Sequence, residues 1–417
     1  MIDIKEQLLV NGDRLWSTIE RSGEIGLGRT TGLCRLALTD ADKEMRDVFM
    51  QWCKEAGCSV TVDQVGNIFA RHAGADDSLA PVVIGSHLDT QVAGGKYDGI
   101  LGVLAGLEVV RTLNDNKTET QRPIEVVCWT NEEGARFNPS MIASGAFSGI
   151  YDVDWVHDQK DDDGIRFGDE LKRIGYDGDT PVGGRTLDSY FELHIEQGPL
   201  LEAEGIDVGF VIGGFKTYGM NIDVRGECAH SGPTPMDKRK NALIGASMLA
   251  VEVNDIGWRY HPDGRSTVPR MQVWPNKAGI LPEWVQITVD FRHPDPAAAK
   301  KMVEELKQAM PKCCERANVE MEIVQSWEFG DEVFDSDLLD TMCDAAGKLN
   351  IPHKEMMSLA GHDAYYISLV APTALIFSPC KDGITHNEAE HIEPEYTLPS
   401  VNVLLNAVIE RANRIDS

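Results

Sequence analysis

Acidic and imidazole side chains follow several apolar runs of this sequence, each at the point where the run ends. The run PIEVVCW (123–129) leads into TNEEG, which places Glu132 and Glu133 side by side. Adjacent carboxylates at the end of a buried strand repel each other, and burying either charge is costly unless a cation offsets it. The pair therefore indicates catalysis: one glutamate can bind a metal ion while the other acts as general base on water.

Further potential metal ligands stand at the ends of other apolar runs. In open α/β sheets, side chains beyond the carboxyl ends of the strands meet at one edge, so residues far apart in sequence can share a site. Imidazole and carboxylate together suit Zn²⁺, with Mn²⁺ or Co²⁺ as substitutes. The candidate residues are His87 and Asp89 in GSHLDT, Asp98 in KYDGILG, His194 and Glu196 in ELHIEQG, and His386 in THNEAE.

Each candidate also has an ordinary structural explanation. A single histidine at a strand end is commonly a hydrogen-bonded polar residue, and Asp98 before Gly99 and a helix is a good N-cap. The glutamate pair is harder to explain in this way. Together the histidines and carboxylates favour a metal site, and a carboxylate such as Asp98 can bridge two ions roughly 3.5–4 Å apart.

Strand-like and helix-like segments alternate through both ends of the chain. This alternation predicts an α/β domain with a mostly parallel sheet. The acidic stretch 158–170 is expected to be a solvated loop. The predicted strands are 81–86, 124–129, 189–198 and 372–379, and the predicted helices are 5–21, 40–57, 99–114 and 394–413.

Residues 216–328 follow a different pattern. Their alternating and amphipathic segments come in the order β-α-β-β-α-β, which is the ferredoxin-like arrangement. We therefore expect a small α+β domain, residues 216–328, inserted into a catalytic domain built from residues 1–215 and 329–417.

The bulk composition narrows the classes of partner. The 417 residues include 39 basic and 67 acidic ones, a net charge of −28, which argues against nucleic acid and anionic membranes. The 9 cysteines are scattered and form no CxxC pair, which indicates a protein whose thiols stay reduced. The first residues show no secretion signal and no apolar run reaches the ~18 residues that a membrane span needs. We expect a cytoplasmic protein.

Eight motifs, in this order and over nearly the whole chain, resemble the amidase–hydantoinase–carbamoylase branch of the dinuclear zinc amidohydrolases. That branch includes N-carbamoyl-L-amino acid hydrolase, β-ureidopropionase and allantoate amidohydrolase, and it is related to aminoacylase and carboxypeptidase G. The motifs are GSHLDT, GGKYDGILGVLAGLE, TNEEGARF, ELHIEQG, AHSGPTPM, DFRHPD, AGHDA and THNEAE.

The resemblance implies two divalent metal ions, zinc first, with manganese, cobalt or nickel as alternatives. Asp98 would bridge the two ions, Glu132 would be the general base, and the Asp89 carboxylate would orient His87. A histidine at position 194, where related peptidases have an acid, points to the carbamoylase branch. The implied metal ligands are His87, Asp98, Glu133, His194 and His386.

The resemblance also implies the substrate contacts. Arg292 would form a bidentate contact with the substrate carboxylate. Gln197, Asn276 and His230 would hold ureido or carboxylate oxygens, and His230 would stabilise the oxyanion. The inserted domain would act as a lid and form a homodimer, so His230 and Asn276 can serve a neighbouring subunit's site. His362-Asp363 would support the ligands.

The implied reaction is hydrolysis of the carbamoyl C–N bond of an N-carbamoyl-L-amino acid or N-carbamoyl-β-alanine to the amino acid, CO₂ and NH₃. Allantoate hydrolysis and N-acyl amino acid amidase or dipeptidase activity are the alternatives on this scaffold. Val92-Ala93 and the SPCKDGITH segment depart from the family pattern near the substrate mouth, which leaves the identity of the substrate open.

Two other classes of protein make different predictions. A non-catalytic binding protein on this scaffold would lack one of the metal ligands or the general base. A nucleotide-dependent oxidoreductase would need GxGxxG after the first strand, whereas Gly99, Gly102 and Gly106 indicate close helix packing.

Overall fold

The computed structural model describes residues 7–414, which form two compact units. One unit comprises the described residues up to Ile212 together with those from Val333 onward, and the other comprises Gly213–Glu332. The metal ligands implied by the resemblance all lie in the first unit. The lid and dimerisation roles of the inserted segment stay predictions.

The first unit is built on an eight-stranded mixed sheet with the order β1-β2-β4-β3-β5-β12-β6-β11. Its centre is parallel, because β3 pairs in parallel with β4 and β5, and β5 with β12. The antiparallel pairs β2–β4 and β12–β6 flank this centre. The α/β class with a mostly parallel sheet is confirmed. The strands are β1 (Ser59–Val62), β2 (Ile68–His72), β3 (Val82–His87), β4 (Ile124–Trp129), β5 (Ser189–Ile195), β6 (Val208–Gly214), β11 (His353–Ser358) and β12 (Thr373–Ser378).

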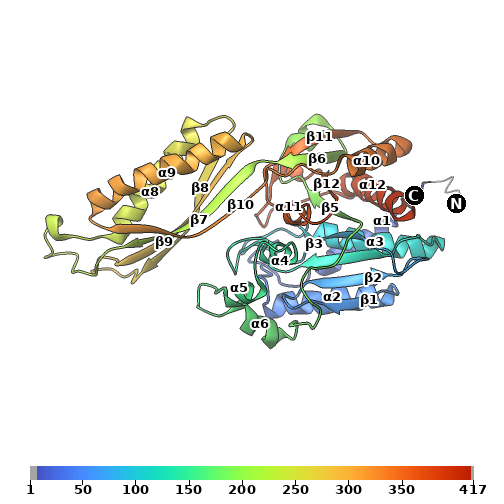
Figure 1. The fold of residues 1–417 in the computed structure, drawn as a ribbon, viewed down its shortest axis with the longest axis horizontal. Helices are drawn as coiled ribbons and strands as arrows, with labels where there is room; N and C mark the ends of the chain where they lie inside the picture. The colour runs from blue at the N-terminus through green and yellow to red at the C-terminus, as the bar shows by residue number, and fades with distance from the viewer. Residues whose placement is uncertain (1–6, 415–417) are drawn as a thin grey trace. The chain divides into compact units, whose positions relative to one another are not determined.

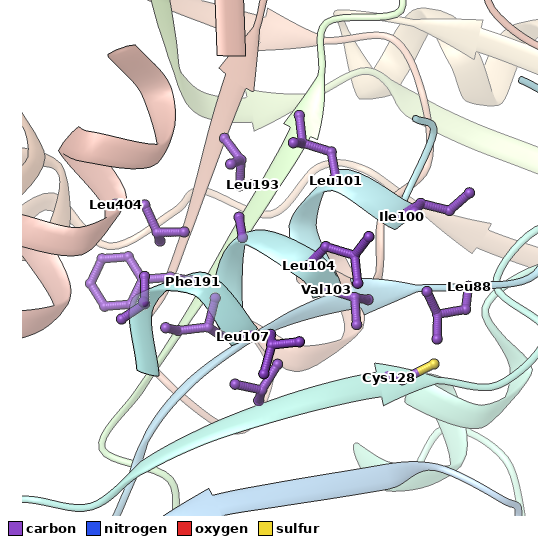
Figure 2. Packing of buried hydrophobic residues seen from close by; sticks show 14 of the residues in the cluster. Leu88, Ile100, Leu101, Val103, Leu104, Leu107, Cys128, Phe191, Leu193 and Leu404 are labelled. Atoms are coloured by element: carbon purple, nitrogen blue, oxygen red, sulfur yellow. The ribbon is translucent and has the colours of Figure 1, made fainter. Parts of the chain in front are cut away.

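Helices of the first unit pack on this sheet. The α3 helix lies against β3, β4 and β5 (Figure 2). Its side chains are buried on nearly every side, which is why the helix is apolar almost throughout. Gly102 allows this approach, since a Cβ there would lie 2.2 Å from the carbonyl oxygen of Leu193. The helices are α1 (Gly12–Ser22), α2 (Asp40–Glu55), α3 (Ile100–Asn116), α4 (Ile142–Phe147), α5 (Val153–Asp158), α6 (Phe167–Ile174), α7 (Leu200–Glu204), α10 (Ser336–Leu349), α11 (Asp363–Ile367) and α12 (Pro394–Asn413).

Two segments differ from the sequence prediction. The first helix begins at Gly12 rather than at residue 5, because the Asn11 side chain caps it and the backbone N–H groups of Leu8 and Val10 donate to side chains of α12. Residues 5 and 6 lie outside the described residues. The acidic stretch 158–170 is not wholly a loop, because α6 begins at Phe167, whose ring is buried.

The second unit contains a four-stranded antiparallel sheet with the order β10-β7-β9-β8. Helices α8 and α9 cover one face of it (Figure 1) and bury a core that includes Ile222, Leu249 and Ile287. This order confirms the ferredoxin-like prediction. The elements are β7 (Lys216–Arg225), α8 (Ala242–Arg259), β8 (Arg265–Trp274), β9 (Trp284–His293), α9 (Pro296–Ala317) and β10 (Glu320–Phe329).

Within residues 7–414, no helix is both long enough and apolar enough to cross a membrane.

Candidate metal centre

The candidate ligands lie at the carboxyl ends of neighbouring central strands. His87 is the last residue of β3, and His194 is the next-to-last residue of β5. Glu133 follows β4, and His386 follows β12. Asp98 precedes α3 and is buried. Because β4, β3, β5 and β12 are adjacent and parallel, their carboxyl ends share one edge of the sheet.

The side chains form two groups that share Asp98. His87, Asp98 and His194 offer ligand atoms within 4.8 Å of one another, and so do Asp98, Glu133 and His386. Oδ1 of Asp98 lies 2.9 Å from Nε2 of His194 and 3.8 Å from Nε2 of His87. Its other oxygen, Oδ2, lies 3.3 Å from Nε2 of His386, which is itself 3.3 Å from Oε2 of Glu133. The Asp98 carboxylate thus presents one oxygen to each group.

The orientation of the two buried imidazoles fits a bound cation. Nδ1 of His87 donates to the carbonyl oxygen of Asp89 at 2.9 Å, and Nδ1 of His194 donates to that of Ile195 at 2.8 Å. Each ring therefore turns its Nε2 toward the Asp98 carboxylate. Burial lowers the pKa of His194, but its hydrogen bond with Asp98 outweighs this effect and raises the pKa to about 9. Burial lowers the pKa of His87 to about 4, which keeps the Nε2 lone pair of that ring free at neutral pH. Imidazole nitrogens and carboxylate oxygens that converge in this way suit a divalent ion such as zinc.

Glu132 lies beside the first group without belonging to either. Its Oε2 is 3.3 Å from Nε2 of His87, and the side chain is buried. Burial, together with the negative charges of Asp363 and Glu133, raises the pKa of Glu132 well above its usual range. Burial also raises the pKa of Glu133 to about 7. A carboxyl group with a raised pKa can donate a proton as well as accept one.

Asp89 acts differently from the expectation. Its carbonyl oxygen, not its carboxylate, accepts the His87 hydrogen bond, and the carboxylate Oδ1 lies 4.0 Å from Nδ1 of that ring. The carboxylate instead accepts the backbone N–H groups of Glu132 and Glu133, each at 3.3 Å. It therefore holds the turn that carries both glutamates, which begins at Asn131 with a φ of 58°.

The residues expected to contact substrate are divided between the units. Gln197, in the first unit, donates from Nε2 to Oδ2 of Asp98 at 2.8 Å, while its buried Oε1 has no hydrogen-bond partner among the described residues. Arg292, in the second unit, pairs with Asp290 through Nε at 2.8 Å and Nη2 at 3.2 Å. Nδ1 of His230 accepts the N–H of Gly232, and Asn276 has a φ of 42°. Their substrate contacts stay predictions.

Three further candidates lie close to the ligands without joining them. Glu196 accepts the backbone N–H groups of Leu200 and Leu201 at 2.8 and 2.9 Å, so it caps α7 and is absent from both ligand groups. The His362 ring packs edge-on against the His194 ring, with 4.5 Å between centroids. The Asp363 carboxylate accepts a hydrogen bond from Ser144.

Sequence reasoning missed three polar residues around the ligands. Gln91 donates to the Glu133 carboxylate from its backbone N–H at 3.1 Å and from Nε2 at 2.9 Å. Thr385 and Glu390 bond to the Asp98 loop. All three lie in loops, where no periodicity marks a contact. The one available signal was their place in the motifs, because Thr385 and Glu390 are the ends of THNEAE and Gln91 directly follows GSHLDT.

Comparison with known proteins adds four findings. Residues 83–410 match the model of peptidase family M20/M25/M40. The N-carbamoyl-L-amino-acid amidohydrolase of Rhizobium meliloti is 44% identical over 411 residues, which cover 99% of each chain. A crystal structure of an amidase of the hydantoinase/carbamoylase family from Burkholderia vietnamiensis has a TM-score of 0.94 at 47% identity, covering 97% of this chain and 98% of that one. Allantoate deiminase 1 of Glycine max is 29% identical and covers 86% of this chain and 81% of its own length.

Proposed function

The chain belongs to peptidase family M20/M25/M40, and on this premise we propose that it hydrolyses the carbamoyl C–N bond of N-carbamoyl-L-amino acids. The products are the amino acid, CO₂ and NH₃. The observation that carries the proposal is the pair of ligand groups sharing Asp98, with Glu132 beside them, in a chain similar over its full length to an N-carbamoyl-L-amino-acid amidohydrolase.

Two divalent ions, zinc first, would be held by the two groups. His87 and His194 would hold one ion, Glu133 and His386 the other, and Asp98 would contribute one oxygen to each. When bound, such ions act as Lewis acids that polarise a carbonyl group and make water more acidic.

Glu132 is the proton carrier of the proposed reaction. Its carboxylate takes a proton from the attacking water and returns it to the departing nitrogen. The raised pKa of Glu132 suits both steps, because a carboxyl group with an ordinary pKa would hold a proton too weakly to deliver it. The Asp89 carboxylate keeps the glutamate turn in place during both steps.

Gln197 and Arg292 would bind the two ends of the substrate. The Nε2 group of Gln197 is engaged by Asp98, so the atom that remains is Oε1, an acceptor suited to a ureido N–H rather than to an oxygen. Asp290 holds the Arg292 guanidinium in a fixed orientation, which favours a bidentate contact with a carboxylate. His230 and Asn276 would hold ureido or carboxylate oxygens. The homodimer and the cytoplasmic location also stay predictions.

The proposal is tested by the substrate range of the purified enzyme loaded with Zn²⁺ or Mn²⁺. The panel contains several N-carbamoyl-L-amino acids, N-carbamoyl-β-alanine, allantoate, and matched N-acetyl and dipeptide compounds. We expect amino-acid release from the N-carbamoyl-L-amino acids and loss of that activity with a chelator. Turnover of only acetyl or peptide substrates would contradict the proposed reaction.

A further inference from the structure

Glu390 is a buried carboxylate that no step of the proposed reaction uses. It lies in the THNEAE motif four residues after His386, and it is 5% exposed. Its Oε1 accepts the backbone N–H groups of Tyr97 and Asp98, at 3.0 and 3.1 Å. One carboxylate oxygen from the loop after β12 thus holds the backbone of the residue that both ligand groups share.

A second connection runs from Glu390 to the Asp98 side chain. Oε2 of Glu390 lies 3.2 Å from Oγ1 of Thr385, and the same hydroxyl lies 3.0 Å from Oδ2 of Asp98. Gln197 donates to that Oδ2 as well. Glu390 therefore contacts Asp98 directly at its backbone and, through Thr385, at the oxygen that faces His386.

Gly95, which lies shortly before Asp98, leaves room for the Glu390 carboxylate. A Cβ at Gly95 would lie 1.9 Å from Oε1 of Glu390 and 2.4 Å from Oε2. The Gly95 backbone therefore packs directly on the carboxylate, and any larger residue would push it from the Tyr97 and Asp98 N–H groups.

We infer that Glu390 is a positioning residue that fixes Asp98 between the two ligand groups. His386 and Glu390 belong to the same loop, so this contact ties a ligand of the second group to the residue shared with the first. Without it, the Asp98 loop would have two unpaired buried N–H groups and no fixed distance from His386. Partners of this kind around a metal site typically change metal affinity by about 10–100-fold when they are removed.

The test is metal affinity, measured by titrating the metal-free full chain with Co²⁺ in competition with a chelator and following the visible spectrum. We expect Glu390→Ala to bind the metal about 10–100-fold more weakly. Glu390→Gln should restore most of this affinity, because its amide oxygen can accept the Tyr97 and Asp98 N–H groups while its NH₂ donates to Thr385. Thr385→Val should weaken binding while leaving the Oε1 contacts intact.

Glu388→Ala is the matched control, since Glu388 lies in the same loop but bonds to Arg29 and Thr30 instead of the Asp98 loop. We expect it to bind Co²⁺ as the unmodified chain does. Wild-type affinity in Glu390→Ala would overturn the inference, and so would a Glu390→Gln protein as weak as Glu390→Ala. If Glu390→Ala does not fold, the Gln and Thr385 variants decide.

The mechanism behind the inference rests on the proposed function, but the cobalt titration needs no substrate. For any substrate that is turned over, the Glu390→Ala protein saturated with metal should show a lower kcat and a nearly unchanged KM. If the panel shows no turnover of N-carbamoyl-L-amino acids while Glu390→Ala binds Co²⁺ more weakly as expected, the proposed reaction is rejected and the inference about Glu390 stands.

Discussion

Replacing Gly99 by alanine is expected to displace the His87 ligand and to remove most of the activity. A Cβ at position 99 would lie 2.2 Å from Nε2 of His87 and 2.3 and 2.4 Å from two carbons of that ring. Ordinary contacts of this kind are about 3.5 Å, so the rigid ring would have to move by about 1 Å. A displacement of about 1 Å in a catalytic site can cost about 10²-fold in rate.

The backbone conformation of Gly99 adds a smaller cost to folding. Its φ is +67° and its ψ is −42°, a sparsely populated combination that costs an alanine about 1–3 kcal/mol. Gly184→Ala separates the two effects, because Gly184 has a φ of +69° and its Cβ would meet nothing within 4 Å.

The assay combines the thermal stability of the metal-free proteins with zinc content and kcat/KM of the loaded ones. We expect Gly184→Ala to retain the zinc content and kcat/KM of the unmodified enzyme. Gly99→Ala should lose about 10²-fold in kcat/KM and bind zinc more weakly. Wild-type kcat/KM and zinc content in Gly99→Ala would refute the placement of His87 against this backbone.

Three further predictions concern single side chains. Glu132→Gln should retain bound metal and lose about 10²–10⁴-fold in kcat, because an amide cannot accept the proton from water; full activity would contradict its role as base. Arg292→Lys should chiefly raise KM for carboxylate substrates, because lysine cannot form the bidentate contact, and an unchanged KM would reject that contact. Burial raises the pKa of Asp63 to about 6, so between about pH 4 and 6 the folded state keeps a proton that the unfolded chain has lost. The free energy of unfolding of the metal-free enzyme should therefore fall as pH rises through this window, and Asp63→Asn should flatten that slope in denaturant titrations.

The sequence alone determined the class of the fold and the identity of the candidate ligands. Strands such as β4 and helices such as α9 and α12 are long or strongly apolar, and local pattern suffices to predict them. The ligands could be named because His87, Glu133 and His194 stand at the ends of such runs, where a parallel sheet brings side chains together. Short edge strands such as β1 and β11, with mixed exposure, carried no comparable pattern.

The tertiary structure alone decided which atom of each residue meets which partner. It divided the two oxygens of Asp98 between the ligand groups, and it gave the His87 hydrogen bond to the Asp89 carbonyl instead of the carboxylate. It also brought Glu390 to the N–H of Asp98 across 292 positions of sequence. Such contacts leave no trace in periodicity, because hydrogen bonds depend on distances and angles within a few tenths of an ångström. Those distances are set only when the strands pack side by side and bring their loops together.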